Sequence, residues 1–286
     1  MTMRANLRIL AAALLIAAVQ AQACPDDRLT AVLVRAWQNA QPVSGLGELP
    51  MADALCLRDS LVLALQPALG RVIGYKAGLT NKVVQQRFGH AAPVRGTLLE
   101  KMLRPQARGA VPAAYGARPI IEADLLAEVK DGAINEARTH LDALKSLSRI
   151  FPFIELADLG IAEGEPITAA KIVAINVGAR GGVYGRPVAA EATQAFADTL
   201  RDMRVIMSDE TGRELANSPG AAILDHPLNA VLWLAQDLQK NGIRLKAGDL
   251  LSLGSFSPLV VPRPGASYSV RYRGLPGDPE VAVSFR

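Results

Sequence analysis

Residues 119–129 read PIIEADLLAEV, an apolar segment interrupted by acids, and this segment decides how the chain is expected to fold. Side chains alternate between the two faces of a β-strand, so the apolar residues are expected on one face and Glu122 and Asp124 on the other. A second apolar run, FPFIEL at residues 151–156, contains Glu155. Both segments are predicted to be strands that carry carboxylates on one face.

These three carboxylates need compensation if their face is buried. Desolvation and mutual repulsion would be relieved by protonation, by a basic partner or by a bound cation. No His or Cys pattern lies near them in the sequence, and a set of carboxylate oxygens suits a hard cation such as Mg²⁺ or Mn²⁺. The pattern alone leaves open the alternative that the acids line the solvent face of half-exposed strands.

A lysine stands in a similar apolar setting. Residues 72–80 read VIGYKAGLT, a pattern typical of a strand that enters a glycine-containing turn. If Lys76 is buried there, its pKa is expected to be lowered, and it can transfer protons or pair with a substrate carboxylate. The alternative is an edge-strand lysine whose ammonium group reaches solvent.

The rest of the chain is predicted to form a short helical region followed by a sheet, which is an α+β fold. Apolar residues at helical spacing predict four helices: Leu29–Gln38, Ala52–Leu65 (ending before Pro67), Ala189–Met203 and Pro227–Lys240. From Arg71 onward, short apolar runs broken by Gly and Pro predict strands, of which the last three are Asp249–Leu253, Tyr268–Arg273 and Glu280–Phe285.

The composition is typical of a globular protein with a sizeable core. The chain has 286 residues, of which 50% are hydrophobic and 20% charged, so one large domain or two modest ones are expected. The formal charge of +4 is spread without long basic runs, and aromatic residues make up 5%. These values argue against a nucleic-acid-binding protein.

The first 23 residues have the pattern of an export signal. Arg4 and Arg8 precede the apolar run 9–19, and a small-x-small cleavage site ends at Ala23. The run is shorter than the roughly 20 residues that a membrane-spanning helix needs, and no later segment is suitable. We therefore expect a periplasmic protein without a membrane span; a retained membrane anchor is the alternative.

Cleavage at this site would leave Cys24 as the first residue. Lipidation of Cys24 is one possible outcome. Pairing with Cys56, the only other cysteine, is another, and the bridge would stabilise the fold by roughly 3 to 4 kcal/mol in the loop-entropy model. The third possible outcome is that both thiols stay free.

Eight short motifs follow one another along the chain: GYKAGLT (74–80), GTL (96–98), IEAD (121–124), IE (154–155), HPLNA (226–230), WLA (233–235), LxAGD (245–249) and Gly254. In order and spacing they resemble the motifs of the 2-keto-4-pentenoate hydratase branch of the fumarylacetoacetate hydrolase superfamily. The resemblance implies a mixed, rolled β-sheet core with packed helices. It divides the chain into a signal peptide (1–23), a small helical region (24–70) and a catalytic domain (71–286), and it implies homo-oligomers.

The resemblance also implies an activity and a set of site residues. Mg²⁺ or Mn²⁺ would bind the 2-oxo or 2-enol and carboxylate oxygens of a small acid, and Lys76 would be the catalytic residue beside the substrate. The implied metal ligands are Glu122, Asp124 and Glu155, and the implied substrate-binding residues are Lys76, Asn176 and Arg180. The expected function is a hydratase acting on a 2-hydroxydienoic or 2-oxo acid; a 2-oxo acid decarboxylase and a non-catalytic periplasmic ligand-binding protein are the alternatives.

The chain departs from the family pattern at five positions, one of which is Gly178 in place of a serine. Asp124 replaces a glutamate that is usual among the metal ligands, and Val94 stands where relatives commonly carry an acid. Ile175 replaces an aspartate, and Leu253 replaces a threonine. The change at Val94 removes a candidate general acid or base, so the sequence supports metal binding better than hydration.

Overall fold

The structure is a computed structural model that describes residues 27–286. The predicted signal peptide and Cys24 lie outside the described residues, so export, lipidation and the pairing of Cys24 with Cys56 stay predictions. Within the described part, no helix has both the length and the apolar character needed to cross a lipid bilayer.

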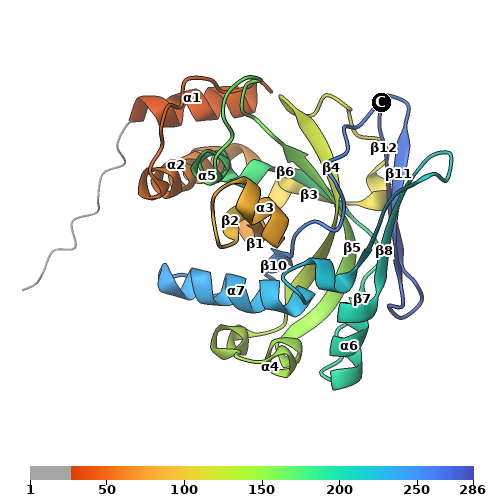
Figure 1. The fold of residues 1–286 in the computed structure, drawn as a ribbon. Helices are drawn as coiled ribbons and strands as arrows, with labels where there is room; N and C mark the ends of the chain where they lie inside the picture. Colours follow the sequence, from red (N-terminus) through yellow and green to blue (C-terminus); the bar gives the residue numbers. More distant parts are fainter. Residues whose placement is uncertain (1–26) are drawn as a thin grey trace, which may run out of the picture.

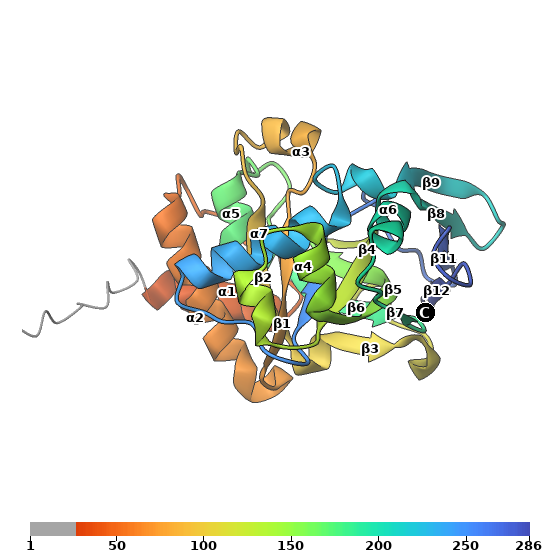
Figure 2. The same cartoon turned by 90° about the horizontal axis from the view of Figure 1, so that it is seen from below.

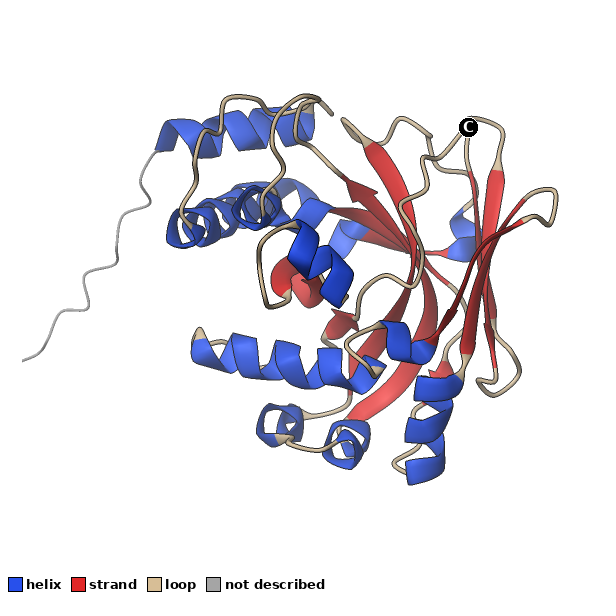
Figure 3. Ribbon diagram, in the orientation of Figure 1, coloured by secondary structure: helices blue, strands red, loops and turns tan. Residues whose placement is uncertain are grey.

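The fold is α+β, as predicted, and its centre is an eight-stranded mixed sheet (Figures 1 and 3). The strand order is β2-β1-β10-β4-β5-β6-β3. The short strand β7 lies off this path and pairs with Arg149 and Ile150, near the beginning of β5. The strands are β1 (Val72–Gly78), β2 (Val94–Leu99), β3 (Leu103–Pro105), β4 (Pro119–Val129), β5 (Leu147–Asp158), β6 (Ala179–Tyr184), β7 (Val188–Ala189) and β10 (Leu250–Ser252).

A second sheet of four antiparallel strands, in the order β12-β11-β8-β9, packs against the first. Its strands are β8 (Arg204–Asp209), β9 (Glu214–Pro219), β11 (Ser267–Arg273) and β12 (Glu280–Ser284). The helices are α1 (Asp27–Gln38), α2 (Met51–Leu69), α3 (Lys82–Arg87), α4 (His140–Lys145), α5 (Ala169–Ala174), α6 (Gln194–Asp202) and α7 (Pro227–Lys240). Figure 2 shows the second sheet at the opposite end of the molecule from α1 and α2.

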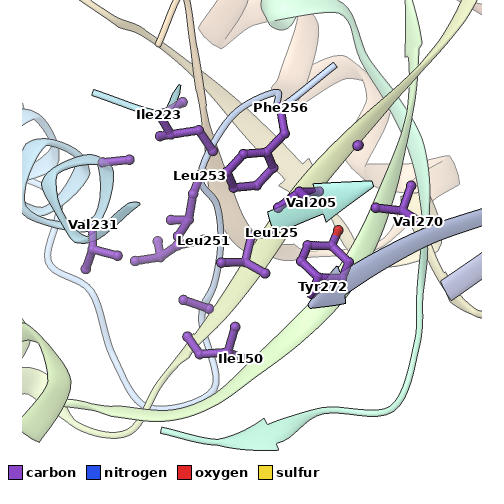
Figure 4. Packing of buried hydrophobic residues seen from close by; sticks show 14 of the residues in the cluster. Leu125, Ile150, Val205, Ile223, Val231, Leu251, Leu253, Phe256, Val270 and Tyr272 are labelled. Atoms are coloured by element: carbon purple, nitrogen blue, oxygen red, sulfur yellow. The ribbon is translucent and has the colours of Figure 1, made fainter. Parts of the chain in front are cut away.

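Two apolar cores lie on the two faces of the large sheet. One core joins that sheet to the four-stranded sheet and to α4, α6 and α7. Figure 4 shows part of it, with Leu125, Ile150 and Leu251 of the large sheet and Val205 and Tyr272 of the four-stranded sheet. The other core joins the opposite face to α1, α2 and α5. Because each face of β4 supplies a core, Asp124 lies inside the protein, whereas Glu122 and Glu128 are half-buried.

Two helix predictions need correction. Helix α2 does not stop before Pro67 but continues to Leu69, with Pro67 in its last turn and Gly70 after its end. The helix predicted at Ala189–Met203 is shorter, because residues 188–189 form β7 beside β5 and α6 begins only at Gln194, after its cap Thr193. The helix Pro227–Lys240 is confirmed.

Helices α1 and α2 fall inside the region predicted to be helical, and β1 begins at Val72. Both helices share a core with α5 and the large sheet; α1 packs on α2, and α2 packs on α5 and β2. The division of the chain at residue 70 into two units stays a prediction.

Candidate active site

The strand register brings two of the three predicted carboxylates face to face. In the antiparallel pair β4–β5, Glu122 lies opposite Glu155, and Asp124 lies opposite Phe153. Directly opposite residues share one face of a sheet, with Cβ atoms about 4.5 to 5.5 Å apart. All three carboxylates therefore lie on the face that α2 and α5 cover.

This face is not open to solvent. Asp124 is fully buried and Glu155 is 5% exposed, whereas Glu122 is half-buried. The alternative in which these acids line the solvent face of half-exposed strands is therefore wrong for Asp124 and Glu155. Ile121, Ala123 and Leu125 occupy the opposite face, as the alternation predicts, and belong to the core beneath the second sheet. Leu126 shares the face of the acids and belongs to the other core.

Lys76 lies against these carboxylates. Its ammonium group, with the residue 3% exposed, forms an ion pair with Oε1 of Glu155 and donates a hydrogen bond to the carbonyl of Val177 at 2.9 Å. The alternative in which the lysine reaches solvent from an edge strand is wrong, because β1 lies between β2 and β10. Gly96 on β2 leaves room for the lysine, since a Cβ there would lie 2.8 Å from Cγ of Lys76.

The electrostatics of the site favour an additional positive charge. Burial, and then repulsion from Glu155, raise the pKa of Glu122 to about 7 and the pKa of Asp124 to about 8. For Lys76, burial lowers the pKa, but the charges of Glu155 and Glu122 raise it by more. The expectation that the pKa of this lysine is lowered is therefore wrong, and Lys76 carries a proton at neutral pH.

Asp124 has a dense set of hydrogen bonds. Its Oδ1 accepts the backbone N–H groups of Leu125 at 2.5 Å, Gly254 at 2.9 Å and Leu253 at 3.1 Å. Its Oδ2 accepts the hydroxyl of Ser252 at 2.5 Å. Asp124 thereby ties β4 to the end of β10 and to the loop that follows it.

A strained turn holds the carbonyl group that Lys76 contacts. Asn176, Val177 and Gly178 all have left-handed φ values, of 56°, 55° and 67°. This conformation is unfavourable for a β-branched residue such as Val177. The side-chain amide of Asn176 stabilises the turn, because it accepts from the N–H of Thr97 at 2.8 Å and donates to the carbonyl of Thr97 at 2.9 Å.

The other two predicted substrate-binding side chains are engaged in structural contacts. The amide of Asn176 is occupied by Thr97, as described. Arg180 donates to the carbonyls of Tyr115 at 2.6 Å and Trp37 at 2.7 Å, and it lies over the indole ring of Trp37. It also forms an ion pair with Asp158 at 3.6 Å. Roles for Asn176 and Arg180 in substrate binding stay predictions.

The chain is similar in sequence to two 2-keto-4-pentenoate hydratases. The chain is 29% identical over 248 residues to a 2-keto-4-pentenoate hydratase from Paraburkholderia xenovorans, covering 85% of this chain and 89% of that one. It is 30% identical over 264 residues to a 2-keto-4-pentenoate hydratase from Burkholderia vietnamiensis, covering 87% of this chain and 96% of that one. The chain belongs to the 2-keto-4-pentenoate hydratase branch of the fumarylacetoacetate hydrolase superfamily. No family model matches it.

A solved structure of the superfamily has the same fold. The 4-oxalocrotonate decarboxylase from Pseudomonas putida G7, complexed with magnesium and adipate, superposes with a TM-score of 0.78 at 25% identity and covers 91% of this chain and 96% of that chain. The predicted fold of the fumarylacetoacetate hydrolase type is therefore confirmed. So is the prediction that this member of the hydratase branch is an enzyme, a carbon–oxygen lyase or a related decarboxylase.

Several residues that the motifs of the hydratase branch do not single out also shape the site. The hydroxyl of Ser252 binds Asp124, and Ser255 hydrogen-bonds Glu122. Tyr272, on β11 of the second sheet, donates to the backbone carbonyl of Asp124 and accepts the N–H of Phe153 at 3.1 Å. For Ser252 and Ser255, the sequence offers one indication, the run LSLGS at residues 251–255, which places two hydroxyl groups at the end of an expected strand. Nothing in the local sequence around Tyr272 indicates its contact with β4.

The departures from the family pattern are visible in the geometry. Val94 lies opposite Gly78, the last residue of β1. It is on the same face of the sheet as Lys76 and is 4% exposed. An apolar side chain thus occupies a place where an acid would lie near the lysine. Arg95, on the other face, is buried and forms an ion pair with Asp237 of α7 at 2.6 Å.

The carboxylates fit a divalent cation by charge and by donor chemistry. Three carboxylates beside one ammonium leave two negative charges in excess when all are ionised, and carboxylate oxygens are the ligands that hard cations prefer. Within residues 27–286, the side-chain contacts of Glu155 engage Oε1 alone. No group of three or more His, Cys, Asp or Glu in that range lies in a geometry that could hold a metal ion. The fit therefore depends on Glu122 and Glu155, which face each other.

Proposed function

We propose that this enzyme is a divalent-metal-dependent hydratase that acts on a small 2-hydroxydienoic or 2-oxo acid. The observation that carries the proposal is the pair formed by half-buried Glu122 and buried Glu155 beside a protonated Lys76. The names of the hydratase relatives and the magnesium in the structural neighbour support it.

Glu122 and Glu155 are the residues that would hold the cation. We propose Mg²⁺ or Mn²⁺, because the site offers only carboxylate and hydroxyl oxygens and no His or Cys ligand among the described residues. When bound, such an ion supplies Lewis acidity toward the oxo and carboxylate oxygens of a 2-oxo acid.

Lys76 donates the proton that the reaction moves, and it binds the substrate acid through a hydrogen bond. An ammonium group has three N–H donors. One N–H is directed to Glu155 and one to the carbonyl of Val177, so the third is left for a substrate carboxylate or carbon. Because Glu155 and Val177 hold Nζ on two sides, the proton is delivered from one defined direction.

Decarboxylation is the second candidate reaction, and Val94 favours it. Addition of water requires a group that activates water, whereas release of carbon dioxide requires stabilisation of the developing carbanion and one proton. Val94 places a buried apolar side chain where an acid would serve the first reaction. Lys76 remains available for the second.

Location and assembly are also proposals. We propose that the enzyme is exported to the periplasm, on the strength of the basic, apolar and small-residue pattern of residues 1–23. The intact mass of the exported protein tests this, because cleavage, lipidation of Cys24 and disulfide formation each change it differently. We further propose a homo-oligomer, which light scattering tests.

The activity is tested by the ultraviolet decay of a 2-hydroxydienoate with Mg²⁺ and with chelator. Metal-stimulated turnover that is lost in Glu155→Gln supports the proposal. Glu128→Gln is the matched control, because Glu128 lies on the same face of β4 but pairs with Arg149 at the far end of the strand. Product analysis separates added water from released carbon dioxide. Inactivity toward a panel of 2-oxo acids and 2-hydroxydienoates with both metals would instead favour a non-catalytic binding protein.

A further inference from the structure

Asp124 differs from Glu122 and Glu155 in how its carboxylate is used. Four hydrogen bonds occupy both of its oxygens: three backbone N–H groups on Oδ1 and the Ser252 hydroxyl on Oδ2. Each carboxylate oxygen has about two lone-pair sites. Oδ1 is therefore saturated, and Oδ2 is already turned toward β10.

The strand register also keeps Asp124 away from the facing pair. Asp124 lies opposite Phe153, two residue pairs along the ladder from Glu122–Glu155. A diagonal neighbour on the same sheet face is about 7 to 8 Å away, against about 5 Å for a direct pair. Aspartate is one methylene shorter than glutamate, so the carboxylate of Asp124 extends less far from the strand than that of a glutamate at this position would.

The hydrogen bonds of Asp124 also connect it to Glu122 through the loop that follows β10. Asp124 accepts the N–H of Gly254, whose φ of 118° is accessible to glycine and whose missing Cβ would lie 2.2 Å from Oγ1 of Thr80. The next residue, Ser255, hydrogen-bonds Glu122. Asp124 thus fixes the loop that orients a metal-binding glutamate.

We propose that Asp124 is not a direct ligand of the cation: Glu122 and Glu155 bind it, and Asp124 acts on it through a bridging water and through the loop 252–255. This inference rests on the proposed metal-dependent function and revises the ligand set expected from the family. The cation then keeps one more exchangeable water than it would with three carboxylate ligands.

The test uses Mn²⁺ as the probe on the full chain. The Mn²⁺ affinity is measured by electron paramagnetic resonance of the free ion, and the waters bound to Mn²⁺ are counted by water-proton relaxation. We expect Asp124→Asn to bind Mn²⁺ about 10- to 100-fold more weakly with an unchanged number of waters. Asp124→Glu, which adds the missing methylene, is expected to displace one water. Glu155→Gln is expected to lose measurable binding.

Asp209→Asn is the control for loss of a buried carboxylate, since Asp209 is 8% exposed on β8 and accepts hydrogen bonds from Thr211 and Arg213. It should leave Mn²⁺ binding unchanged. The proposal is overturned if Asp124→Asn gains a water on the ion or loses binding as completely as Glu155→Gln. If Asp124→Asn does not fold, an unchanged water count in Asp124→Glu overturns it. A wild-type chain that does not bind Mn²⁺ refutes the proposed function itself.

Discussion

Replacement of Lys76 by methionine tests the central interaction of the site without any substrate. The side chains of Lys76 and Glu155 are 4% and 6% exposed, so the pair has little contact with water. Removing one partner of a buried ion pair typically costs about 3 to 5 kcal/mol, because the other charge is left uncompensated. In a protein of this size, the melting temperature is then expected to fall by roughly 6 to 20 °C.

A double-mutant cycle separates the ion pair from the packing of Lys76. Urea unfolding is measured in chelator for Lys76→Met, Glu155→Gln and the double variant. The double variant is expected to be more stable than Lys76→Met alone, because no uncompensated charge remains between those two positions. A cost of Lys76→Met below about 1 kcal/mol, the value of an exposed pair, would refute this reasoning. So would strictly additive costs.

Three further predictions concern pH and packing. The pKa values of Glu122 and Asp124 are raised to about 7 and about 8, so the metal-free protein should lose stability as pH rises from about 4 through 8. In thermal unfolding, Mn²⁺ should abolish this loss. Stability that rises with pH between about 6 and 8 in chelator would contradict the prediction. Burial and the neighbouring imidazole lower the pKa of His226 to about 4, so its neutral form caps α7 and stability should fall as pH drops from about 6.5 to 4. His226→Asn, which keeps a capping acceptor, should reduce this acid sensitivity, and an unchanged melting profile would count against the assignment. Gly182→Ala should cost about 1 to 3 kcal/mol in urea unfolding, because its Cβ would lie 2.1 Å from the ring of Phe153, and Phe153→Leu should recover part of that cost.

The position of each acid on its strand was predictable from the sequence, because alternation is a local property. Glu122 and Asp124 share a face opposite to Leu125, as expected. The helix that begins at Pro227 was equally predictable from its proline at the first turn and the glycine after its end. The extension of α2 through Pro67 was not, since packing against α5 and the sheet outweighs the loss of one backbone hydrogen bond in the last turn.

The partners of each site residue were not predictable from local pattern. The pairing of β1 with β10 brings Lys76 opposite Ser252 from a distant part of the chain, and no spacing rule encodes that register. The direction of the pKa shift of Lys76 was mispredicted for the same reason, because burial alone lowers it and only the facing carboxylates reverse the sign. The hydrogen bonds that hold Asp124 likewise come from β10 and its loop.

The hydroxyl of Tyr272, which reaches from β11 to the backbone beside Asp124 and Phe153, has a consequence for biosynthesis. Ribosomes release the chain from its amino end, so Lys76, Glu122 and Glu155 all emerge well before Ser252 and Tyr272. The hydrogen bonds that Tyr272 makes to the backbone of β4 and β5 can therefore form only after β11 has been synthesised. A nascent chain that ends before Tyr272 would lack these contacts between β11 and the two strands that carry the carboxylates.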